Sequence, residues 1–97
     1  MKKTTDPEVL LLQALAEPTR LAMVRQLARE VEVCACDFTA CCEVAQPTVS
    51  HHLKVLRQAG VVSGDRRGTW IYYRLRPEAM RRLADLVGGL APQPVTT

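Results

Sequence analysis

The sequence predicts one mainly helical α+β domain, and three observations carry that prediction. Apolar residues recur at helical spacing in several segments, and most of these segments begin at a proline, a residue favoured at the first position of a helix. Two short β-rich runs flank a turn segment between two of the predicted helices. The chain of 97 residues has the length of one domain. We therefore expect a single domain over 1–97, with a folded core at about 7–90 and a frayed tail at 92–97.

Local start signals predict the first three helices. Asp6-Pro7-Glu8 combines a capping aspartate, a proline and a first-turn acid, so a helix is expected over about 7–16. A second helix starts at Pro18. Its apolar side is formed by Leu21, Val24, Leu27, Ala28 and Val31. A third, short helix is expected over about 34–44, with Asp37 as the acid of a capping box.

A fourth helix is predicted from Gln46-Pro47 to Gly60. Its apolar side consists of Val49, Leu53 and Leu56, and its other side is polar. A short helix, a tight turn and a second helix with a polar outward face form a helix-turn-helix unit.

The rest of the chain predicts a hairpin and a last helix. The β-rich runs 61–63 and 70–75 flank a basic, glycine-containing turn, and Pro77 starts a helix that ends at Gly88-Gly89. The resulting order, helix–helix–helix–helix–strand–strand–helix, is that of a winged helix-turn-helix. The first and last helices are more apolar than so small a monomer needs, so we expect a homodimer through these two helices.

Positive charge is concentrated in one half of the chain. Residues 50–82 carry eight basic and two acidic residues, whereas residues 1–49 carry five basic and seven acidic ones. A basic surface that follows the fourth helix fits phosphate binding, and it fits a solubilising surface as well.

Membrane insertion and secretion are not expected. No apolar run approaches the roughly 18–20 residues of a membrane span, and residues 1–7 contain no apolar signal segment. We therefore expect a cytoplasmic protein, without a membrane partner, whose cysteines are reduced.

Polar residues of the fourth helix and arginines of the hairpin tip are the candidates for contacting DNA. The helix residues lie away from its apolar side, on the face that would enter a major groove, and the arginines would hold phosphates. The candidate DNA-binding residues are Gln46, Thr48, Ser50, His51, Lys54, Arg66 and Arg67. A symmetric dimer would read a palindromic double-stranded operator with half-sites about one helical turn apart. His52 lies nearer the buried edge and is expected to be structural.

Four clustered cysteines, Cys34, Cys36, Cys41 and Cys42, form a candidate metal site. Cys34 and Cys36 are expected at the start of the third helix, where helix N-terminal donors favour thiolates that can chelate one soft ion. Cys41 would lie about 10 Å from Cys34 along an intact helix, whereas thiolates on one ion lie roughly 4 Å apart. A third thiol ligand therefore requires this helix to unwind; the alternative is a two-cysteine site completed by hydroxide or a small thiol. Cys42 is also a candidate for packing in the core beside Phe38.

Several segments resemble the ArsR/SmtB family of winged-helix metal-responsive repressors. Ala16–Leu21 is similar to the family's opening of the second helix, Gln46–Leu56 to its recognition helix and Gly68–Leu75 to its second wing strand. Glu32-Val33-Cys34-Ala35-Cys36-Asp37-Phe38 resembles the Glu-Leu-Cys-Val-Cys-Asp-Leu box of arsenite-responsive members and of some cadmium- or lead-responsive ones. The resemblance covers about 8–90 and implies a ligand-free dimer that represses its operator and a ligand that releases it.

Four departures from the family pattern bear on the ligand and the cap. Thr39 stands where the box has its third cysteine, so one of the two later cysteines would have to substitute. No cysteine precedes Cys34, which argues against a four-thiolate cadmium or lead site that uses an N-terminal arm. The last helix holds Asp85 but no histidine, so the family's zinc site there is not expected. Ala45 replaces the usual serine before the recognition helix, which weakens that cap by about 0.5–2 kcal/mol.

The resemblance and the cysteines together predict a repressor whose inducer is trivalent arsenic, As(III), with antimony as a second candidate. A Cd(II)- or Pb(II)-responsive repressor and a thiol redox switch of the same fold are the alternatives. No catalytic residue or catalytic cofactor is expected, because the chain has no Cys-x-x-Cys beside a βαβ pattern and no phosphate-binding loop. The third ligand, the operator, and the choice between inorganic and methylated arsenic stay open.

Overall fold

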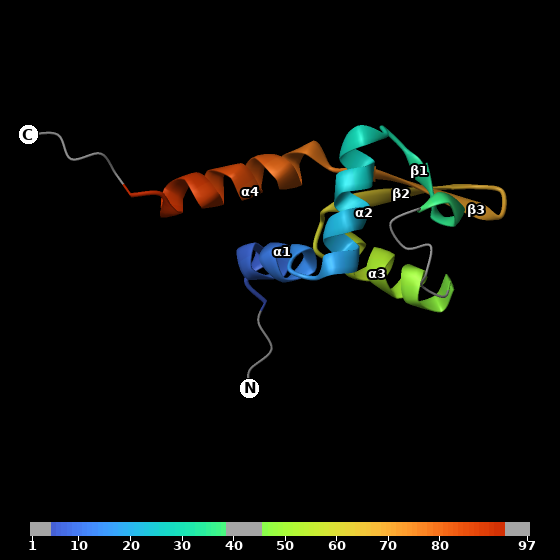
Figure 1. Cartoon of the computed structure of the whole chain (residues 1–97), viewed down its shortest axis with the longest axis horizontal. Helices are drawn as coiled ribbons and strands as arrows, with labels where there is room; N and C mark the ends of the chain where they lie inside the picture. Colours follow the sequence, from blue (N-terminus) through green and yellow to red (C-terminus); the bar gives the residue numbers. More distant parts are fainter. Residues whose placement is uncertain (1–4, 39–45, 93–97) are drawn as a thin grey trace, which may run out of the picture.

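Four α-helices, one 3-10 helix and three strands make up the described part of the chain, residues 5–38 and 46–92 of the computed structural model (Figure 1). In chain order they are α1 (Pro7–Leu15), α2 (Pro18–Arg29), β1 (Val33–Cys34), the 3-10 helix η1 (Ala35–Asp37), α3 (Gln46–Gln58), β2 (Val62–Arg67), β3 (Trp70–Leu75) and α4 (Pro77–Leu90). This arrangement confirms the predicted mainly helical winged helix-turn-helix class. Within the described ranges, each helix is too short or too polar to cross a bilayer.

The predicted starts of α1 and α2 are confirmed. Each helix begins at a proline, and the carboxylates of Asp6 and Glu17 accept hydrogen bonds of 2.9 and 2.8 Å from backbone N–H groups of the first turn. The prediction that Val31 lies on the apolar side of α2 is wrong, because α2 ends at Arg29 and Val31 is 78% exposed. At Glu30 the backbone becomes extended and leads the chain toward β1.

In its described part, the predicted third helix is confirmed only as a single 3-10 turn, with Cys34 as its cap and Cys36 at its second position. Val33 and Cys34 form a short strand that pairs antiparallel with β3, and a single 3-10 turn follows over Ala35–Asp37. The remainder of that predicted helix lies outside the described residues. Strand pairing with β3 supplies backbone partners from a distant part of the chain, which local capping signals cannot reveal. The seven-element order predicted from the sequence therefore lacked one strand.

The sheet has the order β1-β3-β2, so the predicted hairpin is confirmed and extended by β1. The register of β2 and β3 runs from Val62 opposite Leu75 to Arg67 opposite Trp70. Gly68 makes the turn with φ 65°, in the left-handed region that glycine adopts without strain. We call residues 62–75 the wing.

Helix α3 is held by its predicted apolar side. Val49, Leu53 and Leu56 are all buried, and α3 packs against β2, α1 and α2. The helix ends at Gln58, and the φ of 77° at Gly60 lets the N–H of Val61 donate to the carbonyl of Leu56 at 2.9 Å. The polar side of α3 is thereby fixed outward.

The terminal helices α1 and α4 pack on each other and leave apolar side chains in solvent. In α4 only Ala79 is buried, and Figure 1 shows this helix at the opposite end of the molecule from the wing. The terminal-helix apolar surface consists of Leu10, Leu12, Val87 and Leu90. Exposed fractions of 56% for Val87 and 74% for Leu90 indicate a surface that another chain could cover.

Candidate metal centre and nucleic-acid interface

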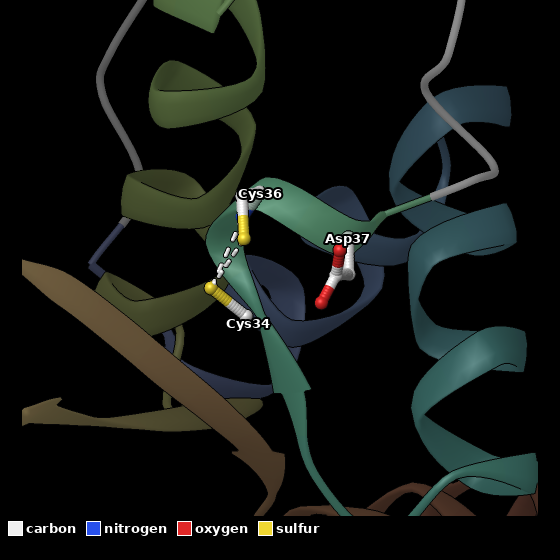
Figure 2. Close-up of side chains that lie close together, drawn as sticks. All are labelled: Cys34, Cys36 and Asp37. Atoms are coloured by element: carbon white, nitrogen blue, oxygen red, sulfur yellow. Dashed lines mark hydrogen bonds between the residues drawn. The ribbon is translucent and has the colours of Figure 1, made fainter.

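Cys34, Cys36 and Asp37 are the one group of three histidine, cysteine or acidic side chains in the described residues that lie close enough together to hold a metal ion. Their ligand atoms lie within 4.8 Å of one another, and the sulfurs of Cys34 and Cys36 are 2.7 Å apart and face each other (Figure 2). Cys34 is buried, whereas Cys36 and Asp37 are exposed. The strand pairing of β1 fixes Cys34, and the 3-10 turn folds Cys36 back over it. The pair can therefore close on one ion from the solvent side.

The end of η1 is anchored to the core. Gln26, which is 1% exposed on α2, donates from Nε2 to the carbonyl of Asp37 at 3.0 Å. The next residue, Phe38, is buried with its ring centroid 6.3 Å from that of Tyr73. These contacts hold the thiol pair at the edge of the sheet.

The expectation that both cysteines favour the thiolate form is wrong for Cys36. The hydrogen bond with the Cys34 sulfur, assisted by burial and by the negative charge of Asp37, raises the pKa of the Cys36 thiol to about 11. The capping geometry exists, but it serves Cys34, whose sulfur accepts the backbone N–H of Cys36 at 3.4 Å. The sulfur of Cys36 contacts the sulfur of Cys34, and because this contact raises the pKa, Cys36 is a neutral thiol at neutral pH.

The other predicted thiol ligands, Cys41 and Cys42, lie outside the described residues. The described part instead adds the carboxylate of Asp37, for which the sequence had predicted only a capping role. Its position directly after Cys36 was the available signal. Two sulfurs and one oxygen form a donor set in which the sulfurs select soft ions.

Four of the predicted DNA-contacting side chains, Thr48, Ser50, His51 and Lys54, are exposed on α3, opposite its buried side. Gln46 is the first residue of α3. A hollow of about 540 Å³ is lined by Ser50, Lys54, Arg57, Gln58 and Tyr73. Arg57, which was not among the predicted DNA contacts, lines the same hollow, because it follows Lys54 by three residues and shares its helix face.

The two predicted wing arginines differ in their surroundings. Arg66 is exposed, and within residues 5–38 and 46–92 it makes no ion pair. Arg67 donates to both oxygens of Glu32 at 2.7 Å and to Asp65 at 3.1 Å. Its guanidinium carbon also lies 4.7 Å from the ring centroid of Tyr72. Arg66 is thus the wing cation with the freer side chain.

His52 connects three helices. Its Nδ1 lies 3.2 Å from the Arg20 guanidinium and 3.7 Å from the Glu17 carboxylate, and Arg20 also donates to the Ala14 carbonyl at 2.7 Å. Burial works against the charge of Glu17, but backbone hydrogen bonds from Arg20 and Thr19 and the charges of His52 and Arg20 lower the pKa of that carboxyl. The network joins the end of α1, the start of α2 and α3, in agreement with the structural role predicted for His52.

Known proteins are similar to this chain in both sequence and structure. The family described as "Bacterial regulatory protein, arsR family" matches residues 17–63. The arsenic resistance transcriptional regulator ArsR1 of Pseudomonas putida is 38% identical over 90 residues, which cover 93% of this chain and 70% of that regulator. The HTH-type transcriptional repressor SmtB of Mycobacterium tuberculosis is 51% identical over 65 residues, and this chain spans 47% of its length.

A solved structure supports the same relationship. The crystal structure described as a possible transcriptional regulator for arsenical resistance aligns with a TM-score of 0.76 and 31% identity, covering 86% of this chain and 85% of the other. The match of residues 17–63 contains both the thiol pair and the whole of α3. This chain therefore belongs to the arsR family of bacterial regulatory proteins, a family of DNA-binding transcriptional repressors and not of enzymes.

Proposed function

We propose that this chain binds its operator as a homodimer and is released when trivalent arsenic binds Cys34 and Cys36. The observation that carries the proposal is the pair of facing sulfurs, 2.7 Å apart, at the junction of β1 and η1. Two relatives support the choice of arsenic: the P. putida regulator named for arsenic resistance and the solved regulator named for arsenical resistance.

The ligand chemistry is a condensation without a redox step. Arsenous acid, As(OH)₃, reacts with the two thiols so that two As–S bonds replace two As–O bonds and two waters leave. Sulfurs bound to one arsenic atom lie roughly 3.5–4 Å apart, a spacing that two thiols facing each other can adopt. The third position on arsenic keeps a hydroxide or takes a further thiol, for which Cys41 and Cys42 are the candidates.

Proton release separates arsenic from divalent soft metals. Because the Cys36 thiol has a pKa of about 11, Cd²⁺ or Pb²⁺ must displace its proton into solution. With arsenous acid the thiol protons leave in the water formed, and no proton is released. Between about pH 6 and 8 we expect the apparent Cd²⁺ affinity to rise by about tenfold per pH unit for each proton released, while the arsenite affinity changes less than about threefold. Competition titrations against a chromophoric chelator at several pH values measure the two affinities. An arsenite affinity that rises with pH as steeply as the Cd²⁺ affinity would contradict the condensation.

The function is tested by fluorescence anisotropy on the DNA directly upstream of the gene for this chain. Arsenite, antimonite, Cd²⁺, Pb²⁺, Zn²⁺ and peroxide are each added to the complex of reduced protein and DNA. Release by arsenite supports the proposal. Release by peroxide alone, reversed by dithiothreitol, would instead identify a redox switch. Release by Cd²⁺ or Pb²⁺ without an arsenite effect would assign the thiol pair to a divalent metal.

The hollow beside α3 supports a phosphate contact by Lys54. Replacing Lys54 by alanine is expected to weaken binding to operator and to unrelated DNA alike, because a phosphate contact carries no sequence information. It should also reduce the slope of log affinity against log salt concentration by about 1. Anisotropy titrations on both DNAs over a range of salt concentrations measure the two effects. A loss confined to the operator would mean that Lys54 contacts a base.

The terminal-helix apolar surface supports a homodimer through α1 and α4. Val87 and Leu90 are too exposed to hold the monomer together, so Val87→Asp is expected to preserve the fold and to dissociate the dimer. Sedimentation velocity measures the oligomeric state, and circular dichroism checks the helices. Val31→Asp is the matched control, because Val31 is equally apolar and 78% exposed but lies beside Pro77 and Glu78 at the start of α4, about 15 Å along the helix from Val87. A Val87→Asp protein that stays dimeric would place the interface elsewhere.

A further inference from the structure

Glu32 connects the thiol strand to the wing. It directly precedes β1, and its two carboxylate oxygens accept both terminal nitrogens of Arg67 on β2 at 2.7 Å. The oxygen Oε2 also accepts Nε of Arg74 on β3 at 3.0 Å. One side chain at the start of β1 therefore holds both strands of the wing. A bidentate carboxylate–arginine pair fixes geometry as well as distance.

A second contact joins the same two places. Tyr72 is the residue of β3 that pairs with Cys34, and the guanidinium carbon of Arg67 lies over its ring, 4.7 Å from the ring centroid. Arg67 is thus contacted by Glu32, two positions before Cys34 in the chain, and by Tyr72, directly across the sheet from Cys34. Two residues of a strand span only about 6.6 Å. A displacement of Cys34 therefore reaches Arg67 through very few atoms.

The local architecture directs a displacement toward β1. Gln26 and the buried Phe38 hold the far end of η1, as described above. β1 itself is an edge strand with only two paired residues, Val33 and Cys34. Elements with few backbone contacts yield first. Because Cys34 lies on this strand, an ion that draws the two sulfurs to its own spacing acts on β1 directly.

We propose that Glu32 is the positioning residue through which an ion bound at Cys34 and Cys36 changes the placement of the wing on DNA. This inference rests on the proposed function and adds the path by which ion binding reaches the wing. The wing is reached through the Glu32 contacts with Arg67 and Arg74, in addition to any effect that runs along the chain toward α3. Glu32 is not one of the grouped potential ligands Cys34, Cys36 and Asp37, and its role is to keep β1 and the wing moving as one unit.

The experiment compares Glu32→Gln with Asp65→Asn in the full-length reduced protein. Both changes remove one carboxylate from Arg67, but the Asp65–Arg67 pair lies within β2, whereas the Glu32–Arg67 pair joins the start of β1 to β2. Operator affinity is measured with and without arsenite, and arsenite binding is followed separately by the near-ultraviolet absorbance of the As–S bonds. Trp70, the sole tryptophan of the chain, starts β3 and is 50% exposed, so its emission reports on the wing directly.

For Glu32→Gln we expect unchanged As–S absorbance and no arsenite-dependent change in Trp70 emission. The release ratio, which is the operator affinity without arsenite divided by that with arsenite, should be at least about fivefold smaller than in the wild type. For Asp65→Asn we expect the wild-type release ratio and emission change, whatever its operator affinity without arsenite. A Glu32→Gln protein that binds arsenite and is released like the wild type would overturn the inference and leave the proposed function standing. A wild-type protein that shows As–S absorbance but no release, or no absorbance at all, would overturn both.

Discussion

Serine at position 34 or 36 is expected to leave operator binding intact and to abolish release by arsenite. A serine hydroxyl is a hard oxygen ligand, so either change leaves a single soft donor and removes the chelate. The sulfurs lie on β1 and η1 and not on α3, so both variants keep the side chains that are proposed to contact DNA. A release ratio of about 5–150 in the wild type should fall to near 1 in both variants. Anisotropy titrations with and without arsenite measure this ratio.

Ala35→Ser is the matched control for both variants. Ala35 lies between the two cysteines and is half-buried, so this change adds a hydroxyl to the same turn without removing a thiol. It should keep the wild-type release ratio. Normal release of the Cys34→Ser and Cys36→Ser proteins would show that arsenic binds elsewhere. Serine at position 41 or 42 then reports on the third ligand, because only the residue that binds arsenic will weaken the response.

The largest loss of stability is expected for Leu56→Ala. Leu56 is 0% exposed at the centre of the core, where α3 meets β2. Removing its branched end loses the transfer free energy of the deleted groups and leaves a cavity, which costs about 2–5 kcal/mol in comparable sites. Against a total of about 5–15 kcal/mol for a small protein, this should lower Tm by roughly 10 °C or more. Thermal unfolding followed by circular dichroism measures the shift.

The control for this prediction is Gln58→Ala on the same helix. Gln58 is exposed, so its truncation should change the free energy of unfolding by less than about 0.5 kcal/mol. All proteins must be compared at one concentration, because a dimer's stability depends on it. Equal Tm values for Leu56→Ala and the wild type would mean that α3 is held by contacts other than its apolar side.

Much of the fold could be predicted because its signals are local. The prolines at the starts of α1, α2 and α4 and the carboxylates of Asp6 and Glu17 act within one helical turn. Gly60, just after α3, and Gly68, just after β2, are the two described residues with positive φ. The apolar side of α3 repeats at the helical period, so its burial and the exposure of Ser50 and Lys54 follow from the same pattern.

The sequence predicted which cysteines form the thiol site but not how they are arranged. Cys34 and Cys36 stand out in the sequence, but whether their segment is a helix or a strand depends on a partner far along the chain. Cys34 pairs with Tyr72 and also caps the short 3-10 turn that follows, and this turn brings the sulfur of Cys36 onto that of Cys34. The raised pKa of Cys36 is a consequence of that contact and has no local signature.

The sequence by itself determined where α1, α2, α3 and α4 begin, which side of α3 is buried, and which polar residues are exposed on its other side. Each of these depends on a residue's own chemistry and its neighbours within one turn or one strand. Only the tertiary structure decided that β1 joins the sheet, that Cys34 and Cys36 face each other, and that Glu32 holds Arg67 from 35 residues away. Those features depend on which distant backbone and side-chain partners the packed core brings together, and no local pattern encodes that choice.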